Sequence, residues 1–262
     1  MADFKESLSA RRAPADDPAN TVARILQPPP VAGLFYEIRG FVELPRLLMW
    51  FPCLARQPRG SGQPVIVLPG YGAGNLSTAA LQTYLRYLGY HVRGIGGGTN
   101  SGDAATQMRR VLRRVMTLAR RTTRKVQLVG WSFGGYLARE AARERPDLVD
   151  QVITLGTPVV GGPKYTVVAR SMRRRGIDVD AIALEIEARN RTSLLTPVTA
   201  IYSRADRVVA WEACLDPAGA NVDHIEVSTT HLGLGFCPEV YEIIAQRLAR
   251  GGTPLSRPPA GR

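Results

Sequence analysis

The serine at position 132 stands between two glycines in the segment VGWSFGG, which covers residues 129–135. A short apolar run precedes it, and a helix-length stretch with an apolar side follows it. The spacing GxSxG in a strand–turn–helix context is typical of a sharp turn that exposes a nucleophilic serine. Side chains at Gly130 or Gly134 would collide with the neighbouring strand and helix, and the N-terminus of the helix favours negative charge near the serine. We interpret Ser132 as a nucleophile. An incidental serine in a glycine-rich turn is the alternative.

A serine hydroxyl needs a base, and the chain contains three histidines. His91 falls inside an apparent strand at 90–95, which favours a sheet or core role. His224 opens the last predicted strand at its amino end. His231 follows that strand by three residues, at the carboxyl end, where it can meet Ser132. The sequence therefore predicts His231 as the base.

A third group must orient the base and stabilise its imidazolium, so a carboxylate is expected on a loop after a neighbouring strand. Asp206 meets this requirement, because it follows the predicted strand at 198–202. Asp223 precedes the last predicted strand and is expected at the far end of the sheet. A surface ion pair with Arg204 or Arg207 is the alternative role for Asp206.

The tetrahedral intermediate of acyl transfer needs hydrogen-bond donors for its oxyanion. One is expected from the backbone N–H of Phe133, directly after the nucleophile. The other is expected from Tyr71 in the segment LPGYGA, residues 68–73, which lacks the lysine and the spacing of a phosphate-binding loop. An apolar pocket is expected from Trp131, Trp211 and Leu232, together with these two aromatic residues.

Six short apolar runs alternate with helix-length segments, at 65–68, 90–95, 126–129, 152–155, 198–202 and 225–228. Such runs predict parallel strands that are covered on both faces. Right-handed crossovers then give an α/β, doubly wound sheet whose ligand site lies at the carboxyl ends of its strands. The helix expected around 108–121 carries its arginines on one face, which we interpret as a solvated face.

The chain divides into a flexible N-terminal tail at 1–30, an apolar helical extension at 31–62, a catalytic domain at 63–250 and a flexible tail at 251–262. Residues 160–195 are longer than a crossover needs and contain a helical stretch at 179–189. A lid over the site is the favoured interpretation. A plain connecting helix with a loop is the alternative interpretation.

The formal net charge of +12 favours anionic partners, although an arginine-rich solvated surface explains it as well. The basic residues are not interleaved with aromatic residues in a nucleic-acid-binding pattern, so no nucleic acid is expected. Three cysteines without a CxxC pair indicate neither a disulfide framework nor a metal site. The N-terminus lacks the apolar run of a secretory signal, and 31–54 is interrupted by charges. A cytoplasmic location is expected, with peripheral contact at a membrane surface left open.

The motifs LPGYG at 68–72 and GWSFG at 130–134, together with Asp206 and His231, resemble the bacterial lipase and esterase branch of the α/β-hydrolase superfamily. The segments LGTP at 155–158 and SRAD at 203–206 resemble one of its subgroups. The order Ser, Asp, His is also that of the superfamily. The resemblance covers about 63–249 and implies a sheet of six to eight strands, ester hydrolysis through an acyl-enzyme, and no cofactor. Proline replaces the histidine often found before the oxyanion-loop glycine.

The predicted function is cleavage of a small-molecule or lipid carboxylic ester. An acyltransferase or a thioesterase would use the same three residues. A non-catalytic binding module on the same fold is a rival from another class, and so is a basic protein that binds membranes or polyanions through 170–175 and the basic helix. Salt-dependent liposome binding that Ser132→Ala leaves unchanged would favour the last of these.

Overall fold

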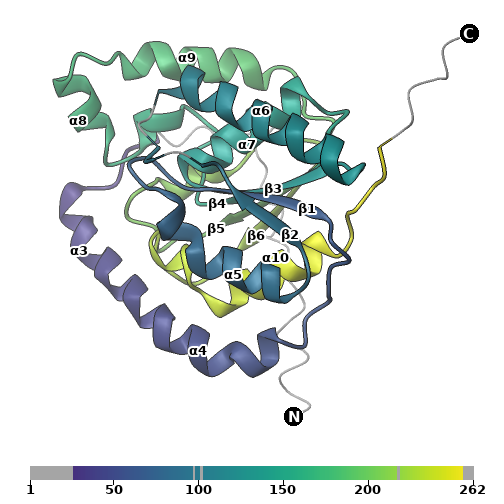
Figure 1. Ribbon diagram of the computed structural model, residues 1–262. Coiled ribbons are helices and arrows are strands. Elements are labelled where there is room, and N and C mark those ends of the chain that lie inside the picture. The colour runs from purple at the N-terminus through teal and green to yellow at the C-terminus, as the bar shows by residue number, and fades with distance from the viewer. Residues whose placement is uncertain (1–25, 97, 101–102, 217–218, 256–262) are drawn as a thin grey trace, which may run out of the picture.

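A sheet of six parallel strands forms the centre of the molecule (Figure 1). The computed structural model describes residues 26–96, 98–100, 103–216 and 219–255. The strand order is β2-β1-β3-β4-β5-β6, and every neighbouring pair is parallel. The strands are β1 (Pro64–Leu68), β2 (His91–Gly94), β3 (Val126–Trp131), β4 (Val149–Leu155), β5 (Val198–Tyr202) and β6 (Val222–Glu226). The doubly wound α/β architecture expected from the sequence is confirmed.

The central strands consist of short runs of mostly apolar residues that are buried on both faces of the sheet. All residues of β1, β3 and β5 are buried. The edge strand β6 instead alternates between less and more exposed residues. Its apolar run therefore begins after its true start, and the sequence placed the strand at 225–228 rather than at Val222–Glu226. As a correction, His224 lies in the middle of β6 and not at its amino end.

Helices cover both faces of the sheet. Alternate residues of β1 show the two layers. Val65 and Val67 pack with α5 (Ala79–Tyr87) and α10 (Pro238–Leu248), whereas Ile66 and Leu68 pack with α6 (Ala104–Thr122) and α7 (Phe133–Glu144). The helix α6 begins at Asp103, whose carboxylate accepts the Thr106 N–H at 3.1 Å. Its arginines face outward while Val111 and Val115 are buried.

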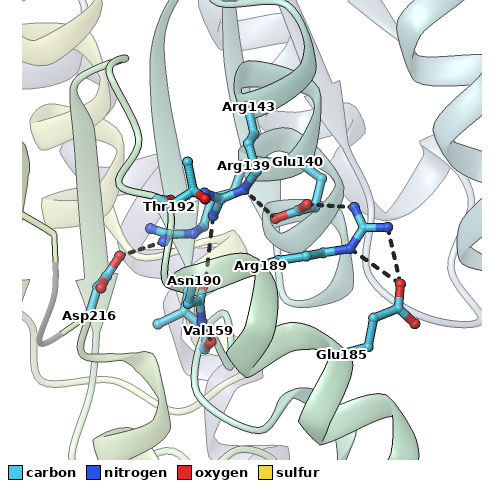
Figure 2. A network of polar contacts seen from close by, with 9 residues as sticks. All are labelled: Arg139, Glu140, Arg143, Val159, Glu185, Arg189, Asn190, Thr192 and Asp216. Carbon is cyan, nitrogen blue, oxygen red and sulfur yellow. Dashed lines mark hydrogen bonds and ion pairs between the residues drawn. The ribbon is translucent and has the colours of Figure 1, made fainter.

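The segment between β4 and β5 forms η4 (Gly162–Tyr165), α8 (Ala169–Arg174) and α9 (Val179–Asn190). The last turn of α9 is tied to neighbouring elements (Figure 2). Arg189 bonds the Glu140 carboxylate of α7 at 3.0 Å, and the Asn190 amide donates to the Val159 carbonyl at 2.7 Å. One end of the expected lid is therefore anchored to the helix that follows Ser132.

The residues before β1 form a continuous helical segment of η1 (Val31–Gly33), α3 (Leu34–Glu37), η2 (Ile38–Val42) and α4 (Glu43–Leu54). It runs along the outside of the molecule in purple (Figure 1), and we call it the N-terminal arm (31–54). Within the described residues, no helix is both long and apolar enough to cross a bilayer. Most of the expected tails, at 1–25 and 256–262, lies outside the described residues.

Candidate active site

Ser132 occupies a tight turn between β3 and α7. Its φ of 53° and ψ of −121° are unusual for a residue with a side chain, and such a conformation costs about 1–3 kcal/mol. The neighbouring strand and loop hold it in place. The Ser132 N–H donates to the Leu155 carbonyl at 2.8 Å, and the Ser132 carbonyl accepts the Thr157 hydroxyl at 2.9 Å. The backbone thus fixes the direction of the serine side chain.

Two glycines make this turn sterically feasible. A Cβ at Gly134 would lie 2.2 Å from the Leu68 carbonyl oxygen, and one at Gly130 would lie 2.4 Å from the Gly134 carbonyl oxygen. Both obstacles are backbone atoms, which have little freedom to move. The strand β1, the turn and α7 can therefore approach one another only with glycine at both positions.

Asp206 and His231 form a buried pair. The Asp206 Oδ2 lies 2.6 Å from the His231 Nδ1. The Asp206 Oδ1 accepts the backbone N–H groups of Val208 and Val209, at 2.8 and 2.7 Å. Only 4% of Asp206 and 5% of His231 are exposed. Both carboxylate oxygens are held, so the aspartate fixes the imidazole ring and its tautomer.

The environment of His231 raises its pKa. Burial opposes the charged form and would lower the pKa, but the charge of Asp206, its hydrogen bond to the ring and the charge of Glu37 together outweigh burial. A carboxylate that holds Nδ1–H leaves Nε2 free to accept a proton. The ring is thus equipped to act as a base.

The histidine loop meets the serine turn at the carboxyl end of the sheet. The Trp131 indole N–H, one residue before Ser132, donates to the His231 carbonyl at 3.2 Å. A Cβ at Gly156, directly after β4, would lie 2.9 Å from the His231 Nδ1. The loops after β3, β4, β5 and β6 therefore converge, bringing Ser132, Asp206 and His231 to one region.

The competing residues lie elsewhere. The His224 Nε2 accepts the Asp216 N–H at 2.9 Å, and Asp223 pairs with Arg247 at 2.6 Å. His91 is the first residue of β2, at the amino end of the sheet. None of these three groups contacts the Asp206–His231 pair.

The two expected oxyanion donors lie on either side of the serine turn. A Cβ at Gly70, next to Tyr71, would lie 3.4 Å from the Ser132 Cβ, and Phe133 directly follows the serine. Both residues therefore lie next to the serine turn.

The expected pocket residues occupy different surroundings. Trp131 is buried against Phe236, with ring centroids 6.3 Å apart. Trp211 stacks on Tyr202 at 5.8 Å, with the Arg204 guanidinium 4.1 Å from its ring centroid. Leu232 and Tyr71 are exposed, by 37% and 39%. Leu232 and Tyr71 thus present side chains to the surface, while Trp131 supports the turn from within.

Comparisons with known proteins agree with the fold. The family model described as alpha/beta hydrolase fold matches residues 63–174. The six-stranded parallel sheet with its flanking helices has the α/β-hydrolase fold. No curated protein matches the sequence.

Solved structures share the fold at low identity. A metagenome-derived lipolytic enzyme has a TM-score of 0.56 and 17% identity, covering 74% of this chain and 96% of its own. An α/β-hydrolase enzyme from lagoon sediments of Mar Chica, Morocco, has a TM-score of 0.55 and 21% identity, covering 73% and 92%. Mouse α/β-hydrolase domain-containing protein 10 has a TM-score of 0.55 and 19% identity, covering 74% and 91%.

Two polar residues that support the candidate site were not found from the sequence. Asn100 is buried, and its side-chain amide donates to the Pro69 carbonyl at 3.0 Å, while its main-chain carbonyl accepts the Gly72 N–H at 2.8 Å. Asn100 therefore holds the Tyr71 loop. The segment GTNSGD, a polar stretch after the second strand, was the available signal.

The second is Glu37 of the N-terminal arm, which is 2% exposed. One carboxylate oxygen accepts the Arg207 N–H at 2.8 Å, and the other accepts the Leu232 N–H at 2.8 Å. Glu37 thus joins the residue after Asp206 to the residue after His231. The arm therefore holds the Asp206 and His231 loops together.

Proposed function

We propose that this α/β-hydrolase is a serine hydrolase that cleaves carboxylic esters through an acyl-enzyme. The observation that carries the proposal is the buried Asp206–His231 pair at 2.6 Å, beside the strained turn of Ser132. A nucleophilic serine, an oriented imidazole and backbone N–H groups beside the serine are the parts that acyl transfer requires.

In this mechanism the Ser132 hydroxyl attacks the ester carbonyl as its proton passes to the His231 Nε2. The Asp206 carboxylate stabilises the imidazolium. The Tyr71 and Phe133 N–H groups stabilise the oxyanion of the tetrahedral intermediate. The intermediate expels the alkoxide, which takes the proton from His231. A water molecule, deprotonated by His231, then attacks the acyl-enzyme, and release of the acid returns the proton to Ser132.

The solved structures support an acyl substrate class without defining it. One is a lipolytic enzyme, and another is a thioesterase domain from the curacin biosynthetic pathway, with a TM-score of 0.51 and 16% identity. Esters and thioesters both react through the same tetrahedral intermediate. The exposed apolar side chain of Leu232, directly after His231, supports an acyl chain as part of the substrate.

The test is hydrolysis of p-nitrophenyl esters from acetyl to palmitoyl by the wild type, Ser132→Ala and a matched serine variant. Ser61 is exposed before the amino end of β1, so Ser61→Ala removes a serine at the opposite end of the sheet. Ser132→Ala should lower kcat by about a millionfold, and Ser61→Ala should leave it unchanged. Equal rates in Ser132→Ala and the wild type would overturn the proposal.

The same assay separates hydrolysis from transfer. Added primary alcohol would give a new ester as the main product if the acyl-enzyme prefers an alcohol to water. Free acid as the main product at all alcohol concentrations supports a hydrolase.

A further inference from the structure

The N-terminal arm has its apolar side chains on the outside. Its buried residues from Gly33 to Glu43 recur every three or four positions and so form one narrow inward face. Eight apolar residues on the remaining surface are more than half exposed: Val31, Phe35, Tyr36, Ile38, Phe41, Val42, Leu48 and Met49. The inward face carries Glu37, Gly40, Glu43 and Leu54, all buried. In water, an amphipathic helix normally buries its apolar face and exposes its charged face. An exposed apolar face of this kind indicates a surface that a partner covers.

The arm buries its carboxylates and exposes its arginines. Its two carboxylates point inward, where Glu37 accepts backbone N–H groups and Glu43 accepts the Thr229 hydroxyl at 2.9 Å. From residue 31 to residue 60, all of which the structure describes, every exposed charged side chain is an arginine. These are Arg39, Arg46, Arg56 and Arg59. Arg39 and Arg46 lie on the arm, where Arg46 pairs with Glu43 at 2.8 Å, and Arg56 and Arg59 follow its last turn. The exposed surface of the arm and of the residues up to 60 is therefore apolar, with arginines as its exposed charges.

The arm is also continuous with the candidate active site. A Cβ at Gly40 would lie 2.6 Å from the Gly233 nitrogen and 2.7 Å from the Thr230 hydroxyl, so the arm is in close contact with the histidine loop. Glu37 bonds the Leu232 N–H, and the Leu232 side chain is exposed. The exposed apolar face therefore begins beside the rim of the site.

The charge of this exposed face indicates which kind of partner could cover it. A second copy of the chain in a two-fold dimer would bring the same face against itself, so the exposed arginines would find no exposed carboxylate of this face opposite them. An anionic lipid surface offers the complementary charge, together with an apolar layer for the aromatic and aliphatic side chains. The arm is about 36 Å long at the helical rise of about 1.5 Å per residue, which suits a helix lying in the plane of an interface.

We propose that the N-terminal arm docks the protein on an anionic lipid bilayer. Its apolar face would enter the boundary between headgroups and acyl chains by about 5–10 Å, and its arginines would contact lipid phosphates. Docking in this way places the histidine loop and the rim of the site next to the membrane surface. The docking is a property of the arm itself and does not depend on the ester chemistry proposed above.

The test is co-sedimentation of the full-length protein with vesicles of phosphatidylcholine, alone or mixed with phosphatidylglycerol. Binding should require phosphatidylglycerol and weaken as salt is added, because the Debye length shrinks. The triple variant Phe35→Ser, Leu48→Ser and Met49→Ser removes three largely exposed side chains of the arm, so folding should be unaffected. It should bind at least about tenfold more weakly, because several apolar side chains lose their burial in lipid.

A matched control removes exposed apolar side chains away from the arm. Leu184 and Leu195 are 68% and 77% exposed, and Leu184→Ser with Leu195→Ser should bind as the wild type does. Ser132→Ala should also bind normally, which separates a failure of docking from a failure of the proposed chemistry. Equal binding by the triple variant and the wild type would overturn the proposal. So would a wild-type dimer in sedimentation velocity that the triple variant converts to a monomer, since a second copy would then be the partner.

Discussion

The Asp206 carboxylate holds the imidazole of His231 through one oxygen and its own loop through the other. Replacement by asparagine keeps the shape of the side chain, and its carbonyl oxygen can still accept the Val208 and Val209 N–H groups. The amide would then face Nδ1 with a donor, which favours the tautomer that carries its proton on Nε2.

We therefore expect Asp206→Asn to lower kcat by about ten-thousandfold, the loss seen when the triad aspartate of a serine protease is changed in this way. The control is Asp223→Asn, which alters the carboxylate paired with Arg247 at the other end of the sheet. Comparable losses in the two variants would refute a role for Asp206 at His231.

Glu37 offers a second test at this scale, because its charge is one of the influences that raise the pKa of His231. The base acts when it is neutral, so activity should rise as the pH passes its pKa. In Glu37→Gln the negative charge is lost and the pKa should fall. The acidic limb of the kcat/KM profile should then move to lower pH.

Glu43→Gln is the matched control for this shift, since Glu43 is a buried carboxylate of the same arm that bonds the Thr229 hydroxyl and Arg46. It is not among the groups that shift the pKa of His231. Its profile should keep the wild-type limb even if the protein is less stable. An unchanged profile in Glu37→Gln would show that this carboxylate only positions the loops.

At the scale of elements, the contact between β1 and α7 depends on Gly134. An added methyl group would meet the Leu68 carbonyl oxygen at 2.2 Å and the Pro69 carbonyl oxygen at 2.7 Å. Gly134→Ala should lower the free energy of unfolding by about 3 kcal/mol, the upper part of the usual range for overpacking. Urea denaturation measures the change.

Gly74→Ala provides the comparison, because a Cβ there meets only the Gly98 carbonyl oxygen at an ordinary 3.4 Å. The φ of Gly74 is −112°, which alanine adopts without strain. This variant should be neutral or slightly stabilising. If both variants unfold at the same urea concentration, the close approach of α7 to β1 is not a constraint on residue 134.

The elements differ in how far the sequence could predict them. Strands that are buried on both faces of the sheet, such as β1 and β5, can be predicted from their continuous apolar sequence. The edge strand β6 does not, because only one of its faces is well covered. The arm was expected to be apolar and helical, but periodicity alone cannot tell which face lies inward. Because the charged residues of a surface helix normally face water, the sequence alone would place Glu37 and Glu43 in solvent.

The candidate site shows the same limit. Asp206 could be preferred to Asp223 because the two lie at opposite ends of predicted strands. The link from Glu37 to Arg207 and Leu232 spans 170 and 195 residues of chain, and no local pattern contains it. Nor could the sequence decide whether Trp131 lines a pocket, since its burial depends on the histidine loop and Phe236.

For the whole molecule, the histidines link stability to pH in opposite directions. The pKa of His231 is raised in the folded state, since Asp206 and Glu37 outweigh burial. Its contribution to stability is fully present below the unfolded pKa of about 6.5 and is lost as the pH rises through the folded pKa. Burial lowers the pKa of His224 and of His91, with help from nearby arginines. Stability should therefore fall as the pH drops below about 6.5.

The free energy of unfolding should thus pass through a maximum near pH 6.5. Urea denaturation between about pH 5 and 8 measures this while thiols, with an ordinary pKa near 8.5, remain largely protonated. Asp206→Asn removes the attraction that raises the pKa of His231, so its curve should lose the decline above the maximum. His224→Gln should instead reduce the decline below it. A wild-type curve that keeps rising to pH 8 would mean that His231 gains no charge stabilisation from Asp206, and the buried pair would then be a hydrogen bond between a carboxylate and a neutral ring.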